Sequence, residues 1–351
     1  MTDYKASKRI IGTSAQRATF AISAPQWQEL DRVTLSSAGN DLDTSTFSTK
    51  DNIMILANPI WNSGNPSPDF RFNGDSGSNY SRRLSVDGGS DIATTSQAEL
   101  YSDTWGGGAA SGMHSFEVME LVNMSAQEKL IIYDKIYNRA GTGAGNTPNR
   151  IEGVHKWANT SAQINRVQLL SSVSNAFASG TEIVVLGYDN DEDGSGSNFW
   201  QELASVTASG SSSTLSSGTF TAKKYLMVTG YIDNTDSNYM RFNSDSGSNY
   251  ARRRSDNGNS DVATETSQDR IYSNWTTAAQ GFIMYIINKS DEEKLVMLHD
   301  TEVDTTGAGT APYRFELAAK WANTSDQITS IAFNKGSNYG STSFVRVYGA
   351  D

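Results

Sequence analysis

One internal repeat, running through most of the chain, constrains the fold more than any other sequence feature. The segment Trp27–Leu30 returns as Trp200–Leu203 with identical residues. The matches keep their order toward the C-terminus, where Lys156–Ser161 returns as Lys320–Ser325. A unit of about 160 residues is far longer than a solenoid repeat, so each copy should form its own hydrophobic core. The sequence therefore predicts a tandem duplication of one domain.

The repeat divides the 351-residue chain into four parts. We predict an N-terminal arm over residues 1–26, a first domain over 27–188, a linker over 189–198 and a second domain over 199–351. The linker is acidic and rich in Gly and Ser, which is typical of solvated connections. The two copies differ in length mainly in segments rich in Gly, Ser and Asn, which we expect to be loops.

Within each copy, short apolar segments alternate with clusters of Gly, Asn, Asp and Ser. The candidate strands of the first copy are Gln28–Leu35, Asn52–Pro59, Asp69–Asn73, Ser115–Val122, Leu130–Tyr137, Ile151–Ala158, Ile164–Leu170 and Glu182–Tyr188. Their β-branched and aromatic residues favour strands, and few windows hold the apolar stripe of a helix. The sequence predicts an all-β chain of two tandem antiparallel β-sandwich domains of the jelly-roll type.

The composition excludes several function classes. The net charge of −11 disfavours nucleic acid as a partner, because phosphate binding needs a basic surface. The absence of cysteine excludes disulfides and thiolate chemistry. No apolar run is long enough to span a bilayer and no signal peptide is evident at the start, so we expect no membrane partner.

Two similar loops, Arg71–Tyr80 and Arg241–Tyr250, are the first candidates for a binding surface. In a binding role, their polar side chains would bond a sugar or a neighbouring subunit, and Tyr would offer a stacking face. In a structural role, Asp and Asn would satisfy the backbone of the loop itself, and this role is favoured because a duplicated fold must keep its turns. The candidate residues are Arg71, Asn73, Asp75, Asn79 and Tyr80, with Arg241, Asn243, Asp245, Asn249 and Tyr250 in the second copy.

The repeated tryptophans Trp157 and Trp321 also allow two interpretations. Each follows a Lys and precedes Ala-Asn-Thr-Ser at the end of a candidate strand. A buried Trp with its indole N–H bonded is the favoured interpretation, and a platform for carbohydrate is the alternative.

A weak metal signal lies in the linker. Asp189, Asp191 and Asp193 precede a Gly and have the alternating spacing of calcium ligands. Trp200 stands where a closing bidentate Glu is expected, so a solvated linker is favoured and Ca²⁺ is the alternative. The sequence indicates no other cofactor.

The candidates for catalysis are few. The three histidines, His114, His155 and His299, are not repeated between the copies and have no zinc or triad spacing. In the repeat register, His299 corresponds to Asp134. We therefore expect a protein that is not an enzyme.

The N-terminal arm is basic, although the protein is acidic. Lys5, Lys8 and Arg9 are expected to pair with acidic surfaces of neighbouring proteins, and Ile10 and Ile11 to pack against apolar ones. The alternative is a disordered tail.

Several segments resemble virion proteins of tailed bacteriophages. They are Lys8–Ala15, Arg71–Gly77, Trp157–Ile164, Trp321–Ile328 and Phe344–Gly349. The resemblance implies β-sandwich domains in a head-decorating, head-fibre or tail protein. It also implies a homo-oligomer that is assembled in the host cytoplasm, is located in the virion and has capsid subunits or other virion proteins as partners.

These observations lead to two main hypotheses. The first is a non-enzymatic capsid decoration (cement) protein, or a related head protein, acting by protein–protein adhesion. The alternative is a tail-fibre or receptor-binding protein that recognises a host glycan through its two repeated loops. A polysaccharide-degrading spike is less favoured, because it would need a defined pair of carboxyl groups.

Overall fold

A computed structural model describes residues 26–62, 67–102, 113–138, 141–191, 197–233, 236–272, 279–303 and 307–351. The predicted contacts of Lys5, Lys8, Arg9, Ile10 and Ile11 lie outside these residues, as does Asp193, a candidate ligand in the alternative calcium interpretation. In the described part of the chain, no helix has the length and hydrophobicity needed to cross a membrane.

The first domain is an antiparallel β-sandwich of two sheets. The larger sheet has eight strands in the order β1-β12-β3-β8-β9-β10-β5-β6, and the smaller has four in the order β2-β11-β4-β7. The strands are β1 (Gln28–Thr34), β2 (Asp41–Asp43), β3 (Asn52–Asn58), β4 (Asp69–Phe72), β5 (Tyr80–Val86), β6 (Ile92–Gln97), β7 (Leu100–Tyr101), β8 (Ser115–Val122), β9 (Lys129–Tyr137), β10 (Asn149–Trp157), β11 (Val167–Leu170) and β12 (Glu182–Tyr188).

The second domain repeats this strand order. Its larger sheet runs β13-β24-β15-β20-β21-β22-β17-β18 and its smaller sheet β14-β23-β16-β19. The strands are β13 (Gln201–Thr207), β14 (Thr214–Ser216), β15 (Tyr225–Ile232), β16 (Asn238–Phe242), β17 (Tyr250–Asp256), β18 (Val262–Gln268), β19 (Ile271–Tyr272), β20 (Gln280–Ile287), β21 (Lys294–Glu302), β22 (Tyr313–Trp321), β23 (Ile331–Lys335) and β24 (Phe344–Ala350). The predicted all-β antiparallel sandwich class is confirmed.

The strand registers also correspond between the domains. Trp157 on β10 pairs with Lys129, and Trp321 on β22 pairs with Lys294 in the same way. A register shift interrupts β1 after Glu29, and the corresponding shift interrupts β13 after Glu202. Positions in the two domains can therefore be compared one by one. An ancestral duplication stays an interpretation of this correspondence.

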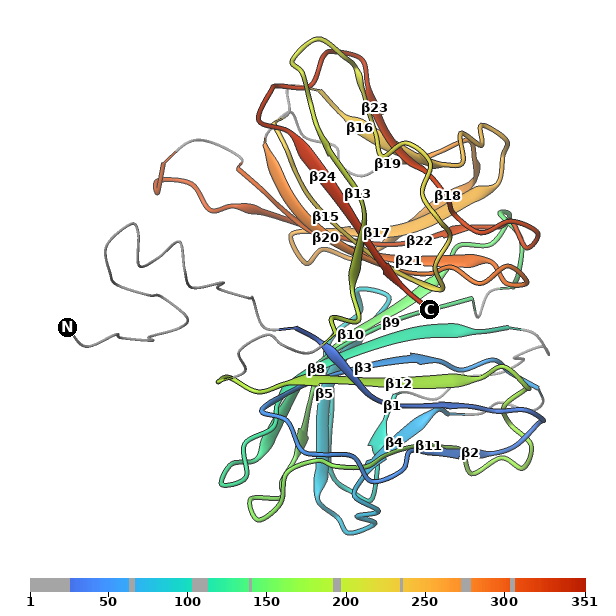
Figure 1. Cartoon of the computed structure of the whole chain (residues 1–351), viewed down its shortest axis with the longest axis vertical. Coiled ribbons are helices and arrows are strands. Elements are labelled where there is room, and N and C mark those ends of the chain that lie inside the picture. The colour runs from blue at the N-terminus through green and yellow to red at the C-terminus, as the bar shows by residue number, and fades with distance from the viewer. Residues whose placement is uncertain are drawn as a thin grey trace.

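The four sheets are arranged in layers. The two large sheets face each other in the middle of the molecule, and each small sheet packs on the far side of its own large sheet (Figure 1). Each domain has a separate apolar core, with Phe72 and Trp157 in the first and Phe242 and Trp321 in the second. We call the face of each large sheet that packs on its own small sheet the inner face, and the opposite face the outer face. The inner faces are covered by the core of their own domain, and the outer faces are left for other contacts.

One carboxyl group in the core of the second domain has no hydrogen-bond partner in the described part of the chain. Asp300 on β21 is 5% exposed, and neither of its oxygens is bonded. In the first domain, Lys135 occupies the position of Asp300 and pairs with Glu117 on the neighbouring strand. In the second domain, the residue opposite Asp300 is the apolar Phe282. Burial raises the pKa of Asp300 to about 9, and the nearby charges of Glu302 and Asp256 add to this.

We expect Asp300→Asn to stabilise the protein in alkaline solution. Because its pKa is raised in the folded state, Asp300 lowers the stability progressively as pH rises from about 4 toward about 9. The urea midpoint of the variant should therefore exceed that of the wild type at pH 8, and the difference should shrink toward pH 4. Asp41→Asn, at an exposed position of β2, is the control. Equal gains at pH 4 and pH 8 would contradict the assignment.

Candidate interaction surface

The outer faces of the two large sheets pack on each other and form a third apolar cluster. From the first domain it contains Met54, Leu56, Phe116, Val118, Ile136, Val184 and Leu186. From the second it contains Tyr225, Tyr285, Ile287, Leu295, Met297, Ala318 and Ala350, together with Phe199 and Trp200 of the segment before β13. The domains are therefore joined by a hydrophobic interface as well as by the linker.

The hairpin between β20 and β21 fixes this interface through polar contacts. Its Lys289 donates to Asn58 Oδ1 of the first domain at 3.0 Å, and Glu292 lies 2.8 Å from His114 Nδ1. Burial alone would raise the pKa of Glu292, but His114 and Lys289 outweigh burial and lower it to about 2. Glu293 accepts from Asn138 and forms a buried ion pair with Lys320 at 3.1 Å.

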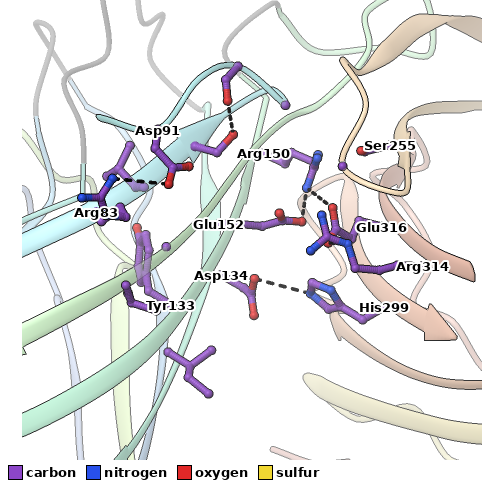
Figure 2. A pocket seen from close by; sticks show the side chains of 18 residues that line it. Arg83, Asp91, Tyr133, Asp134, Arg150, Glu152, Ser255, His299, Arg314 and Glu316 are labelled. Carbon is purple, nitrogen blue, oxygen red and sulfur yellow. Dashed lines mark hydrogen bonds and ion pairs between the residues drawn. The ribbon is translucent and has the colours of Figure 1, made fainter. Parts of the chain in front are cut away.

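Beside the apolar cluster, a cleft of about 580 Å³ lies between the domains and is lined by ionisable residues (Figure 2). Asp134 of the first domain pairs with His299 of the second at 3.4 Å. Arg150 of the first domain pairs with both Glu152 and Glu316, the second of these across the interface at 3.4 Å. These side chains extend from the central strands of the two large sheets, so the cleft exists only when both domains are in place.

Three of these residues could hold a metal ion. Asp134, Glu152 and His299 bring ligand atoms within 4.8 Å of one another. However, the pKa of His299 is raised to about 9. Burial alone would lower it, but the neighbouring Asp134 carboxylate outweighs burial. A protonated imidazole is not a metal ligand, and Glu152 is already paired with Arg150. The arrangement favours an ion-pair cluster that joins the domains.

The most unusual surface is an apolar area on the outer face of the first large sheet. Val122, Leu130, Ile132 and Val154 are 53%, 66%, 62% and 53% exposed. They line a groove of about 720 Å³ that is also lined by Trp27 and Tyr188. We call these six residues the open face. Scattered exposed apolar residues are ordinary, but a contiguous group in a groove marks an interaction site.

The corresponding positions of the second domain are covered. Ile287, Leu295, Met297 and Ala318 occupy the places of the four exposed residues and are at most 4% exposed. All four belong to the cluster between the domains. The first domain therefore covers this region of the large sheet in the second domain. The second domain does not cover the equivalent region in the first.

The candidate loops from the sequence are built as self-contained turns. Asp75 accepts from the Trp157 indole at 2.8 Å and from the Gly77 and Asn79 nitrogens. These bonds hold the pKa of Asp75 below its usual value, although burial acts to raise it. The Tyr80 ring is 1% exposed, so it offers no face for stacking.

The remaining candidate residues of these loops also have internal partners. Arg71 pairs with Glu99 and Asn73 bonds the backbone of Gln163, whereas Arg241 pairs with Asp269 and Asn243 bonds the backbone of Gln327. Asp245 accepts from Trp321 at 2.7 Å and from Asn249, and the Tyr250 ring is fully buried. The stacking role considered for Tyr80 and Tyr250 is wrong, because both rings belong to the core.

The linker does not gather its carboxylates in the described residues. Asp189 accepts from Lys50 Nζ and from the Asp51 backbone, both at 3.0 Å, and so belongs to the first domain. Asp191 is exposed in a turn. The calcium loop considered as the alternative therefore loses its first ligand to an ion pair.

No family model and no curated protein sequence matches the chain. Among solved structures, the chain is similar to the mouse laminin alpha1 chain, domains LG4-5, with 10% identity over 93% of this chain and 91% of that chain. The TM-score of this match is 0.19.

Proposed function

We propose that the chain is a non-enzymatic structural protein that acts by protein–protein adhesion through the open face of the first domain. The observation that carries this proposal is the exposure of Leu130 and Ile132 in a groove, while their counterparts Leu295 and Met297 are buried under a neighbouring domain. The same region of this fold thus already serves as a protein interface once in the molecule. Contiguous exposed apolar residues are typical of protein interaction surfaces.

Within this class we propose a capsid decoration protein or a related head protein. This finer assignment is supported by the sequence resemblance to phage virion proteins. The alternative, a tail protein that binds a host glycan, is less favoured because the polar groups of the repeated loops bond within the protein, as in Asp75 with Trp157.

Two experiments test the proposal. Antibodies against the chain should label the heads of purified particles in electron microscopy; label on the tail would favour the glycan-binding alternative. In a loading assay with particles lacking the protein, Ile132→Glu should abolish binding, because it places a charge in an apolar contact. Ser78→Glu, which adds the same charge to the exposed loop 71–80, is the matched control. Loading of Ile132→Glu at full occupancy would contradict adhesion through this face.

A further inference from the structure

A glycine-rich segment of the first domain, residues 143–150, docks on the second domain. It reads Gly-Ala-Gly-Asn-Thr-Pro-Asn-Arg and leads into β10. Three of its main-chain groups bond the second domain: the Gly143 N–H bonds Glu293, the Ala144 carbonyl accepts from the Ser267 N–H at 2.7 Å, and the Pro148 carbonyl accepts from Arg253 Nε at 2.9 Å. Arg150 forms a bidentate pair with Asp261, with both N···O distances 2.8 Å. We call the four contacted residues of the second domain the docking site: Arg253, Asp261, Ser267 and Glu293.

The first domain carries the same four residue types at the equivalent positions. We call them the equivalent site: Arg83 for Arg253, Asp91 for Asp261, Ser96 for Ser267 and Glu128 for Glu293. Ser96 and Ser267 share a left-handed backbone, with φ of 55° and 50°. The side chains of Arg253, Asp261 and Glu293 are 13%, 1% and 4% exposed, whereas those of Arg83, Asp91 and Glu128 are 60%, 56% and 42% exposed. The equivalent site is therefore complete but uncovered.

The glycine-rich segment is repeated as well. Residues 307–314 of the second domain read Gly-Ala-Gly-Thr-Ala-Pro-Tyr-Arg, which keeps the Gly, Ala, Pro and Arg of the four contact positions. Residues 307–312 are exposed, and the side chain of Arg314 is 59% exposed. Arg314 and Asp91 line the cleft between the domains from opposite sides (Figure 2). The second segment and the equivalent site thus border one cleft.

We propose that residues 307–314 dock on the equivalent site of the first domain, as residues 143–150 dock on the second. Arg314 then pairs with Asp91, the main chain of the segment bonds the rest of the equivalent site, and the cleft closes. The chain's own segment is favoured over that of a second copy because Arg314 already faces this cleft, which gives it a high effective concentration. Beyond the proposed function, the docked segment competes with a partner of the open face, since Arg83 lines both the cleft and the groove.

This closure is expected to be reversible, because part of the observed contact has no counterpart. Lys289 and Glu292 bond the first domain from the hairpin between β20 and β21. Their equivalents in the first domain are the uncharged Met124 and Gln127. The second docking therefore lacks these polar contacts, and a partner can displace the segment by binding the open form.

Disulfide formation between introduced cysteines tests the proposal, because the natural chain has none. A main-chain hydrogen bond brings two residues within the range of a disulfide. Ser267→Cys with Ala144→Cys is therefore the reference pair, and Ser96→Cys with Ala308→Cys is the test pair. In dilute full-length protein, we expect the test pair to form an intramolecular disulfide at a rate within about tenfold of the reference. Equal urea midpoints of the two reduced variants show that both fold.

A charge variant ties this disulfide to the proposed contact. Adding Arg314→Ala to the test pair should slow the disulfide at least about fivefold, because the ion pair with Asp91 is lost. Arg346→Ala, which removes an arginine of β24 that is 46% exposed, is the control and should leave the rate unchanged.

Two outcomes would overturn the inference. One is a test-pair rate more than about tenfold below the reference, because the segment then does not dock. The other is a disulfide that links two chains and forms faster as the protein concentration rises, because a second copy then supplies the segment. The proposed function is tested separately, since loading of Ile132→Glu onto particles involves neither cysteine pair and requires no closure of the cleft.

Discussion

Replacing Glu293 by alanine is expected to lower the free energy of unfolding by about 3–5 kcal/mol, because it leaves a buried lysine without its counterion. The Lys320 side chain is 0% exposed and pairs with Glu293 at 3.1 Å. Glu293 also accepts from Asn138 across the interface, so the substitution weakens the docking of the hairpin. Urea denaturation followed by circular dichroism measures the change.

The repeat supplies a matched control for this prediction. Glu128 and Lys156 occupy the positions of Glu293 and Lys320 and also form an ion pair, at 3.2 Å, but their side chains are 42% and 41% exposed. Solvent screens such a pair, so Glu128→Ala should change the stability by at most about 1 kcal/mol. Adding Lys320→Met to Glu293→Ala should restore most of the loss, because both charges are then absent. Equal effects of Glu293→Ala and Glu128→Ala would contradict burial of the interface.

Trp157→Ala is expected to lower the free energy of unfolding by about 3–5 kcal/mol, because it opens a large cavity in the core of the first domain. The ring is fully buried, packs near Phe72 and Tyr80, and donates its indole N–H to Asp75. Trp157→Phe keeps an aromatic ring but loses the hydrogen bond, so it should cost about 1–2 kcal/mol. Equilibrium unfolding of both variants in urea measures these losses. A loss of less than about 1 kcal/mol for Trp157→Ala would show that the loop Arg71–Tyr80 is not held in place by this tryptophan.

Much of the fold was accessible from the sequence, because apolar strands between turn residues have a local signature. The predicted strands Ser115–Val122 and Glu182–Tyr188 match β8 and β12 to the residue. The strands that were missed in the first domain are β2, β5, β6 and β7. In β5, which reads Tyr-Ser-Arg-Arg-Leu-Ser-Val, two central arginines hide the strand signal. Its Arg82 bonds the Tyr101 backbone, a tertiary contact that no local pattern indicates.

The candidate surface was not predicted, although one signal for it is present. In β9 the consecutive residues Leu130, Ile131 and Ile132 are all apolar, and such a run indicates a strand that is covered on both faces. The counterpart in β21, from Leu295 to Leu298, is apolar in the same way. Both runs therefore predict a covered outer face, and only the three-dimensional arrangement tells which domain covers the other.

The loops were misleading for a related reason. Arg71–Tyr80 and Arg241–Tyr250 are so similar because each must bond the same buried tryptophan, Trp157 or Trp321. Similarity between repeats therefore reflects the shared fold here. The residues of the open face are instead distinguished by a difference in burial between the two domains, which the sequence does not record.

The burial of one large sheet by the other is tested most directly by two single-cysteine variants of the second domain. Met297 on β21 is 4% exposed and Val303, just beyond the strand, is 47% exposed. Val303→Cys should react with a thiol reagent at the rate of a free thiol. Met297→Cys should react roughly 100-fold more slowly, because labelling then requires the domains to separate or the strand to open. Equal labelling rates at the two positions would mean that the outer face of the second domain is uncovered in solution.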